Sequence, residues 1–223
     1  MSTLIYPNKC LFCGKIISEN ETLCKTCLET IKLVGKNTCK YCGRDLEYCR
    51  CKIGDFAFDG NASCFYYIGT TRILVHRFKF RKRPQLGKIL SESMIKTIGD
   101  KYKGFTFDRV MFVPATKMNR MVRGYDQAEI LADNISALLG IPLCSDLKSK
   151  FRLLPQKSVG YKNRRKNVKG KFYIENSDLK GKRILLVDDV MTSGSTLSEC
   201  AKILKKAGAK EVYCITFAIT LKK

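Results

Sequence analysis

Apolar and polar residues beyond residue 60 fall into alternating blocks that predict buried strands separated by helices. Three β-branched, apolar runs are typical of strands inside a parallel sheet: 108–113, 183–190 and 211–219. Two segments with a helical pattern follow the first two runs, 126–139 and 195–207, and each ends next to a glycine. Because strands alternate with helices, we expect an α/β fold with crossover connections.

The segment that precedes these strands has a mixed pattern. A strand and turn are predicted near 63–69, followed by a helical stretch that a basic loop at 81–84 interrupts. Residues 51–63 read as a linker with aromatic anchors. We therefore predict two domains, a small one at 1–60 and a large one at 61–223.

The small domain is rich in cysteine, with eight of the twelve cysteines of the chain. They form four short pairs: Cys10 and Cys13, Cys24 and Cys27, Cys39 and Cys42, Cys49 and Cys51. Four thiolates around a tetrahedral ion are typical of structural zinc, so these pairs predict two closed Zn²⁺ sites. A disulfide framework would require an oxidising compartment, and a thioredoxin-like redox pair would open a helix in a βαβ unit. Neither context is visible in this sequence.

The four cysteine pairs can be combined in two ways. Sequential sites would join the first pair to the second and the third to the fourth, and would close short loops. A crossed arrangement would join the first pair to the third, with longer loops at a modest extra entropy cost. We favour the sequential arrangement.

Charge distinguishes the two predicted domains. Residues 61–223 carry 33 basic and 13 acidic side chains, which leaves +20 of the total net charge of +22. Such a field attracts polyanions such as nucleic acid, nucleotides and phosphorylated sugars, unless it serves solubility alone. No apolar run is long enough to span a bilayer, and the first residues lack a secretion-signal pattern, so we expect a cytoplasmic protein without membrane insertion.

The predicted strand 183–190 ends in chemistry suited to a ligand. Asp188 and Asp189 stand near its carboxyl end, where ligands collect in open α/β sheets. The loop that follows is small and hydroxylated: Met191, Thr192, Ser193, Gly194, Ser195 and Thr196. Free amides at the following helix start and these hydroxyls can surround a phosphate. The carboxylates then suit sugar hydroxyls, directly or through hydrated Mg²⁺. The alternative is a capped helix with local turns.

The stretch VDDVMTSGST resembles the fingerprint of the type I phosphoribosyltransferases, which bind phosphoribosyl pyrophosphate (PRPP). Together with the cysteine-rich front end, the whole chain resembles the ComF family of competence proteins, also called ComFC or GntX-like. Residues 113–114 and 123–129 are similar to further family segments, as are Arg152, Gln156, Arg164 and Asn167. The resemblance implies a type I phosphoribosyltransferase-like parallel sheet flanked by helices, with a small zinc-ribbon-like domain in front.

The resemblance also implies residue roles. Asp188 and Asp189 would be the catalytic carboxylates that hold the ribose hydroxyls, while the loop 191–196 would take the 5-phosphate. The pyrophosphate, with Mg²⁺, would meet Ala115, Thr116 and Lys117, assisted by Arg123. A solvated surface is the alternative for Lys117 and Arg123. Asp126 stands where the family usually has Asn, so it either points away from the ligand or pairs with a cation.

A basic segment at 147–174 carries ten Lys or Arg residues and no acid, with aromatic residues between them. Basic and aromatic side chains together suit single-stranded nucleic acid. The residues that we assign to this contact are Lys162, Arg164, Arg165 and Lys166. The resemblance implies that the same segment covers the active site as a mobile hood. Phe172 and Tyr173 suit the core of a small β-element equally well.

Two functions follow from the resemblance. The first is handling of single-stranded DNA during natural transformation, with PRPP bound and a DNA helicase or recombination factor as partner. The second is phosphoribosyl transfer from PRPP to an unidentified acceptor.

Overall fold

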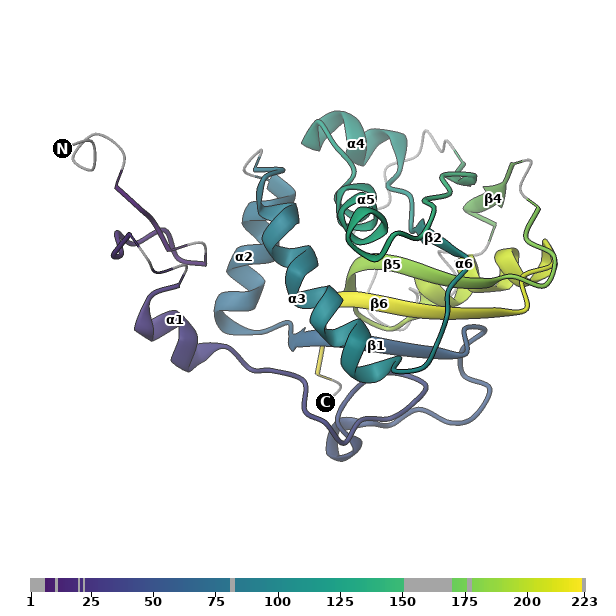
Figure 1. Ribbon diagram of the computed structural model, residues 1–223, viewed down its shortest axis with the longest axis horizontal. Coiled ribbons are helices and arrows are strands. Elements are labelled where there is room, and N and C mark those ends of the chain that lie inside the picture. The colour runs from purple at the N-terminus through teal and green to yellow at the C-terminus, as the bar shows by residue number, and fades with distance from the viewer. Residues whose placement is uncertain are drawn as a thin grey trace.

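The centre of the molecule is a four-stranded parallel sheet in the order β1-β6-β5-β2 (Figure 1). The computed structural model describes residues 7–10, 12–19, 21, 23–80, 83–150, 170–175 and 178–221. The strands are β1 (Gly60–Tyr66), β2 (Arg109–Phe112), β5 (Arg183–Met191) and β6 (Glu211–Ile219). The parallel sheet and its three later strands are confirmed.

Strand β1 begins earlier than the sequence pattern predicted. Residues 60–63 belong to it, so their assignment to a linker was wrong. The polar side chains of Asn61 and Ser63 are buried because they hydrogen-bond inside the sheet. Asn61 donates to Ser63 Oγ at 3.0 Å, and Ser63 Oγ and Thr216 Oγ1 share a 2.7 Å hydrogen bond. A buried strand can therefore carry polar residues when each finds a partner.

Helices cover both faces of the sheet (Figure 1). On one face lie α2 (Gly69–Phe80), α3 (Leu86–Lys101) and α5 (Gln127–Leu139), and on the other lies α6 (Ser195–Lys206). The predicted interruption between two basic helices is confirmed, since α2 ends at Phe80 and α3 begins at Leu86. Within the described part of the chain, no helix combines the length and apolar character needed to cross a bilayer.

Shorter elements complete the fold. Helix α4 (Lys117–Arg123) follows β2, and β3 (Leu147–Ser149) pairs antiparallel with β4 (Phe172–Ile174) in a small second sheet. Both Phe172 and Tyr173 lie in this β-element, but only Phe172 belongs to the core, because Tyr173 is exposed. In the cysteine-rich segment lie α1 (Lys25–Thr30) and a 3-10 turn, η1 (Leu46–Tyr48).

The cysteine-rich segment is bound to the sheet through its backbone. Val34 donates its amide to the Cys64 carbonyl at 3.0 Å, and Tyr66 donates its amide to the Lys32 carbonyl at 2.8 Å. Lys101, the last residue of α3, donates its ammonium to the Lys36 carbonyl at 2.8 Å. These contacts fix the segment against strand β1 and helix α3.

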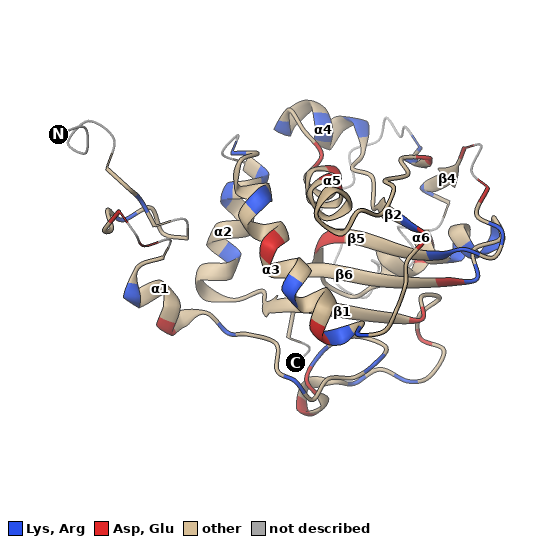
Figure 2. Cartoon of the chain, in the orientation of Figure 1, with Lys and Arg blue, Asp and Glu red and all other residues tan. Residues whose placement is uncertain are grey.

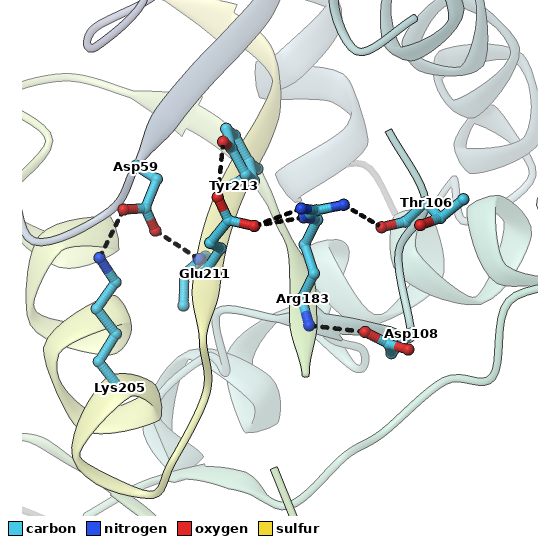
Figure 3. A network of polar contacts seen from close by, with 8 residues as sticks. Asp59, Thr106, Asp108, Arg183, Lys205, Glu211 and Tyr213 are labelled. Atoms are coloured by element: carbon cyan, nitrogen blue, oxygen red, sulfur yellow. Dashed lines mark hydrogen bonds and ion pairs between the residues drawn. The ribbon is translucent and has the colours of Figure 1, made fainter. Parts of the chain in front are cut away.

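The amino ends of the strands are joined by a polar network (Figure 3). Arg183 forms an ion pair with Glu211 at 2.6 Å, and its amide donates to Asp108 Oδ2 at 2.7 Å. Lys205 of α6 pairs with Asp59 at 2.7 Å just before β1. The network occupies one edge of the sheet, so the chemistry of the opposite, carboxyl edge is separate from it.

Candidate functional site

Asp188 and Asp189 lie near the carboxyl end of β5, as the sequence pattern predicted. Because side chains alternate along a strand, the two carboxylates face opposite sides of the sheet. Asp189 is only 7% exposed and pairs with Lys79 Nζ of α2 at 2.7 Å. The Asp188 carboxylate faces the α6 side, where it adds to burial in raising the pKa of Cys200. The two acids thus lie on opposite faces of β5 near its carboxyl end.

Electrostatics at this point favours partners that donate hydrogen or carry positive charge. Burial and the neighbouring Asp189 carboxylate raise the pKa of Asp188 well above its usual value. Burial disfavours the Lys79 ammonium, but the carboxylates of Asp189 and Asp188 raise the pKa of Lys79 above its ordinary value. One lysine therefore balances two adjacent acids, and the remaining carboxylate charge suits sugar hydroxyls or a divalent cation.

The loop after β5 brings hydroxyl side chains to the start of helix α6. Gly194 has a φ of 80° and forms the N-cap of α6, so the free amides of the helix start lie in this loop. Ser193 Oγ and Ser195 Oγ share a 2.9 Å hydrogen bond. A Cβ at position 194 would lie 2.6 Å from the Phe56 ring, which leaves room only for glycine. Thr192 and Thr196 complete the hydroxyl-bearing stretch, and Met191 before it is buried as the last residue of β5.

The loop after β2 lies beside β5, because Val113 donates its amide to the Val187 carbonyl at 3.0 Å. The Ala115 amide donates to Asp126 Oδ2 at 2.6 Å, so this donor is already engaged within the protein. Thr116 accepts the Asn119 amide at 3.3 Å and caps α4, and Lys117 is exposed at the start of that helix.

Asp126, the departure from the family pattern, has a structural role. It is 4% exposed and caps α5 by accepting the Ala128 amide at 3.1 Å, in addition to the Ala115 amide. Burial raises its pKa, while the two amides and the Arg120 guanidinium oppose this shift. The side chain therefore joins the loop after β2 to the start of α5 and does not project from the surface.

Arg123 is a packed residue and not a freely solvated cation. It donates to Gln127 Oε1 at 2.6 Å, and its guanidinium lies 5.1 Å from the centre of the Phe80 ring. Phe80 is half exposed at the end of α2. Basic residues gather on α4 and on the nearby part of α2, while acidic residues mark the adjoining end of β5 (Figure 2). Cations thus border the acidic strand end.

The eight amino-terminal cysteines form two clusters. One contains Cys10, Cys13, Cys24 and Cys27, and the other contains Cys39, Cys42, Cys49 and Cys51; within each, the sulfurs lie within 4.8 Å of one another. This is the sequential arrangement. Neighbouring sulfurs are 3.3–3.6 Å apart, near the roughly 3.8 Å edge of a zinc–thiolate tetrahedron.

The surroundings of the cysteines shift their pKa values in both directions: burial raises the pKa of Cys27, Cys42 and Cys51, whereas one thiol in each cluster is favoured as a thiolate. Burial opposes ionisation of Cys10, yet backbone amides led by that of Cys13 lower its pKa to about 6. Backbone and thiol donors led by Cys51 lower the pKa of Cys49 to about 7 against the effect of burial. The residues therefore fit two structural zinc ions, each with four sulfur ligands and no open position for a reaction.

The residues predicted to contact nucleic acid, Lys162, Arg164, Arg165 and Lys166, lie outside the described residues. The family-pattern residues Arg152, Gln156 and Asn167 lie outside them as well. Their role remains a prediction.

Three residues of the site were not assigned from the sequence. Lys79 stood out only as one of several cations before Glu92, and nothing in the pattern linked it to Asp189. Phe56 was interpreted as a linker anchor, but it packs against Gly194. Arg44 follows a cysteine pair and reaches the Thr192 carbonyl at 2.8 Å. Each acts across more than a hundred residues of sequence, which local patterns do not reveal.

Two family models match the chain. The phosphoribosyl transferase domain matches residues 125–223, and the double zinc ribbon domain matches residues 1–64. Among solved structures, purine phosphoribosyltransferase from Pyrococcus horikoshii is 25% identical, with a TM-score of 0.37 over 59% of this chain and 73% of the other. Adenine phosphoribosyltransferase from Saccharomyces cerevisiae is 14% identical, with a TM-score of 0.42 over 64% and 72%. The sheet and the two matching models define a protein with a type I phosphoribosyltransferase fold and a double zinc ribbon.

Curated relatives narrow this class. Competence protein F of Haemophilus influenzae is 29% identical over 92% of this chain and 93% of its own length. The DNA utilization protein YhgH of Escherichia coli is 26% identical over 92% and 88%, and competence protein ComFC of Streptococcus pneumoniae is 25% identical over 92% and 96%. The chain is thus a homologue of competence protein F, ComFC and YhgH, which confirms the resemblance seen in its sequence.

Proposed function

We propose that the protein binds PRPP with Mg²⁺ at the carboxyl edge of its sheet and acts in the handling of single-stranded DNA during natural transformation. The observation that carries the proposal is the junction of β5 and α6, where Asp188 and Asp189 adjoin the loop 191–196. Relatives named as competence proteins support the biological role.

Each part of the ligand has a matching group. The hydroxyls of the loop, with the amides at the start of α6, suit the 5-phosphate. Asp188 and Asp189, one on each face of β5, would hold the ribose hydroxyls if the ribose lies across the carboxyl end of the strand, with Lys79 holding the second carboxylate in place. The two ends of α4, with Lys117 at its start and Arg123 at its last residue, suit the pyrophosphate. Mg²⁺ would neutralise the negative charge where the phosphates of PRPP approach the two carboxylates.

Single-stranded DNA is the proposed macromolecular ligand. The support is the concentration of positive charge in residues 61–223 and the basic segment with Lys162, Arg164, Arg165 and Lys166. The protein would work in the cytoplasm, with a DNA helicase or recombination factor as partner. Binding should weaken steeply as salt increases, and Arg164→Ala with Arg165→Ala should reduce both affinity and salt dependence in fluorescence anisotropy. Salt-independent binding, or full affinity in the double variant, would contradict this part.

A second candidate function is enzymatic transfer of the phosphoribosyl group to an unidentified acceptor. It is favoured by the paired carboxylates, which can stabilise positive charge at the ribosyl carbon as pyrophosphate leaves. A pyrophosphate-release assay with candidate acceptors separates the two ideas. Release that Asp188→Asn abolishes supports the enzyme, whereas PRPP binding without release under any condition supports the binding role.

The PRPP site is tested by calorimetric titration of the full chain with PRPP and Mg²⁺. We expect Asp188→Asn to weaken binding at least tenfold because it removes a charged acceptor for ribose hydroxyls. The matched control is Asp178→Asn, an exposed aspartate that lies away from the carboxyl edge. Absence of PRPP binding by the unaltered chain, or equal affinities of the two variants, would refute the site.

A further inference from the structure

A buried arginine, Arg44, connects the second cysteine cluster (Cys39, Cys42, Cys49 and Cys51) to the loop 192–196, the proposed phosphate site. Arg44 is the second residue after Cys42 and is 0% exposed. Its Nη2 donates to the Thr192 carbonyl at 2.8 Å, and its Nε donates to the Thr220 carbonyl at 2.8 Å. Thr220 Oγ1 donates to the same Thr192 carbonyl at 3.2 Å. The first peptide of the loop is thus held by two donors from outside it.

The guanidinium of Arg44 is charged and desolvated. In the described part of the chain it pairs with no carboxylate, and its Nη1 has no hydrogen-bond partner there. Burial of an unpaired cation is costly, so a position that retains one requires compensation. The Cys42 thiolate supplies part of it, since Arg44 and Cys42 attract each other electrostatically, and a dianion in the adjacent loop would supply more, because Coulomb attraction is strong where water is excluded.

The position of Arg44 is set by the cysteine cluster. The Cys39 amide donates to the Arg44 carbonyl at 2.8 Å, which closes the turn that presents the cluster. Gly43 has a φ of 74°, and a Cβ there would lie 2.4 Å from the Asn61 carbonyl oxygen of β1. Asn61 also donates to the Cys42 carbonyl at 3.1 Å. The turn is therefore pressed against the sheet, and the direction of the arginine depends on it.

We propose that Arg44 is a positioning residue for phosphate binding, through which the folded second cysteine cluster holds the loop 192–196 ready for its ligand. The inference rests on the proposed PRPP site and adds a dependence that the site alone does not require. The fixed Thr192 carbonyl orients the peptide that leads to Ser193 and Gly194, and the buried charge lies behind the loop. Loss of the metal-bound turn would free both the Thr192 carbonyl and the Arg44 guanidinium from these positions.

The first experiment measures PRPP and inorganic phosphate affinity by calorimetry for full-length Arg44→Met and Arg44→Lys. We expect Arg44→Met to weaken the binding of both ligands at least tenfold. Arg44→Lys keeps the positive charge but loses one donor direction, so its affinity should lie between those of Arg44→Met and the unaltered chain. The matched control is Arg50→Met, because Arg50 is exposed in the same ribbon and, among the described residues, donates to the carbonyls of Glu47 and Cys49 alone. It should retain full affinity.

The second measurement separates positioning from general stability. Hydrogen exchange at the amides of Ser193 and Gly194 should accelerate in Arg44→Met, while zinc content and exchange in β2 stay unchanged. If Arg44→Met does not fold, Thr220→Val provides a milder test, since it removes the other donor to the Thr192 carbonyl. It should weaken phosphate binding by a smaller factor, about threefold, and full affinity in this variant would count against the inference.

The third measurement tests the link to the cluster. Cys39→Ser should weaken PRPP binding in the unaltered background but add little in the Arg44→Met background, because both changes remove one anchor. Independent, additive losses would overturn the inference. Failure of the unaltered chain to bind PRPP would instead remove the proposed site, whereas normal PRPP binding by Arg44→Met would leave that site intact and overturn the role of Arg44 alone.

Discussion

The ion pair between Lys79 and Asp189 gives a quantitative prediction for Lys79→Met. The atoms are 2.7 Å apart, and the side chains are 22% and 10% exposed. Removal of one partner from a fully buried pair costs about 3–5 kcal/mol, because the other charge remains without compensation. The cost is smaller here because both side chains are partly exposed, so we expect a loss of about 2–3 kcal/mol in the free energy of unfolding at neutral pH. For a chain of this size that corresponds to a fall in Tm of about 4–12 °C.

The loss should depend on pH in a defined direction. Lys79 opposes the upward pKa shift of Asp188, so its removal raises the pKa of that buried carboxyl further. A carboxyl whose folded pKa exceeds its unfolded value costs no stability below the unfolded pKa, and costs progressively more as the pH rises toward the folded pKa. The deficit of Lys79→Met should therefore shrink at acidic pH and be largest at neutral pH.

Thermal denaturation followed by circular dichroism at pH 7.5 and pH 5 tests this reasoning. Lys88→Met is the matched control, because Lys88 is an exposed lysine of α3. The double variant Lys79→Met with Asp189→Asn should recover most of the lost stability, since it removes the uncompensated acid as well. A loss equal to that of Lys88→Met, or one independent of pH, would refute the account of a compensated acid pair.

Three further predictions concern other parts of the molecule. Metal analysis should find two zinc ions per chain, one for each cysteine cluster, and a single ion would contradict the two-site arrangement. Gly194→Ala should cost about 1–3 kcal/mol of unfolding free energy and weaken phosphate binding, because φ is 80° there and the Phe56 ring is too close; unchanged affinity would argue against the loop as the phosphate site. Arg183→Met should lower the unfolding free energy by about 1–2 kcal/mol without changing PRPP affinity, since its network lies at the amino ends of the strands; a change in affinity would contradict that separation.

The sequence predicted the layout of the sheet because its signals are local. The runs at 183–190 and 211–219 have apolar centres, residues 184–187 and 212–215, as buried strands do, and the glycines after α5 and α6 mark where those helices end. The paired acids and the hydroxyl loop follow directly from the end of β5, so the candidate site could also be located. The two cysteine clusters could be predicted as well, because the spacing of the cysteine pairs is also a local signal.

Long-range contacts could not be predicted in this way. Residues 60–63 looked like a linker because their polar side chains find partners only when Thr216 lies beside them. Helix α4 is short, and its exposed Met121 and Val122 gave no helical periodicity. Asp126 was expected to point away from the ligand or pair with a cation, but the two backbone amides that it accepts could not be foreseen. These outcomes depend on residues that are distant in the sequence, and a single sequence does not show which of them lie close together in the fold.

The pairing of β1 with β6 has a consequence for synthesis of the protein. Gly60 lies opposite Tyr213, so β6, which is synthesised after β1, β2 and β5, separates β1 from β5 in the finished sheet. The cysteine clusters can take up metal while translation continues, but the arginine contact to Thr220 must wait until β6 and Thr220 have been synthesised. A nascent chain stalled before β6 would therefore carry metallated ribbons beside an unfinished sheet with an unpaired edge, a state open to aggregation and proteolysis.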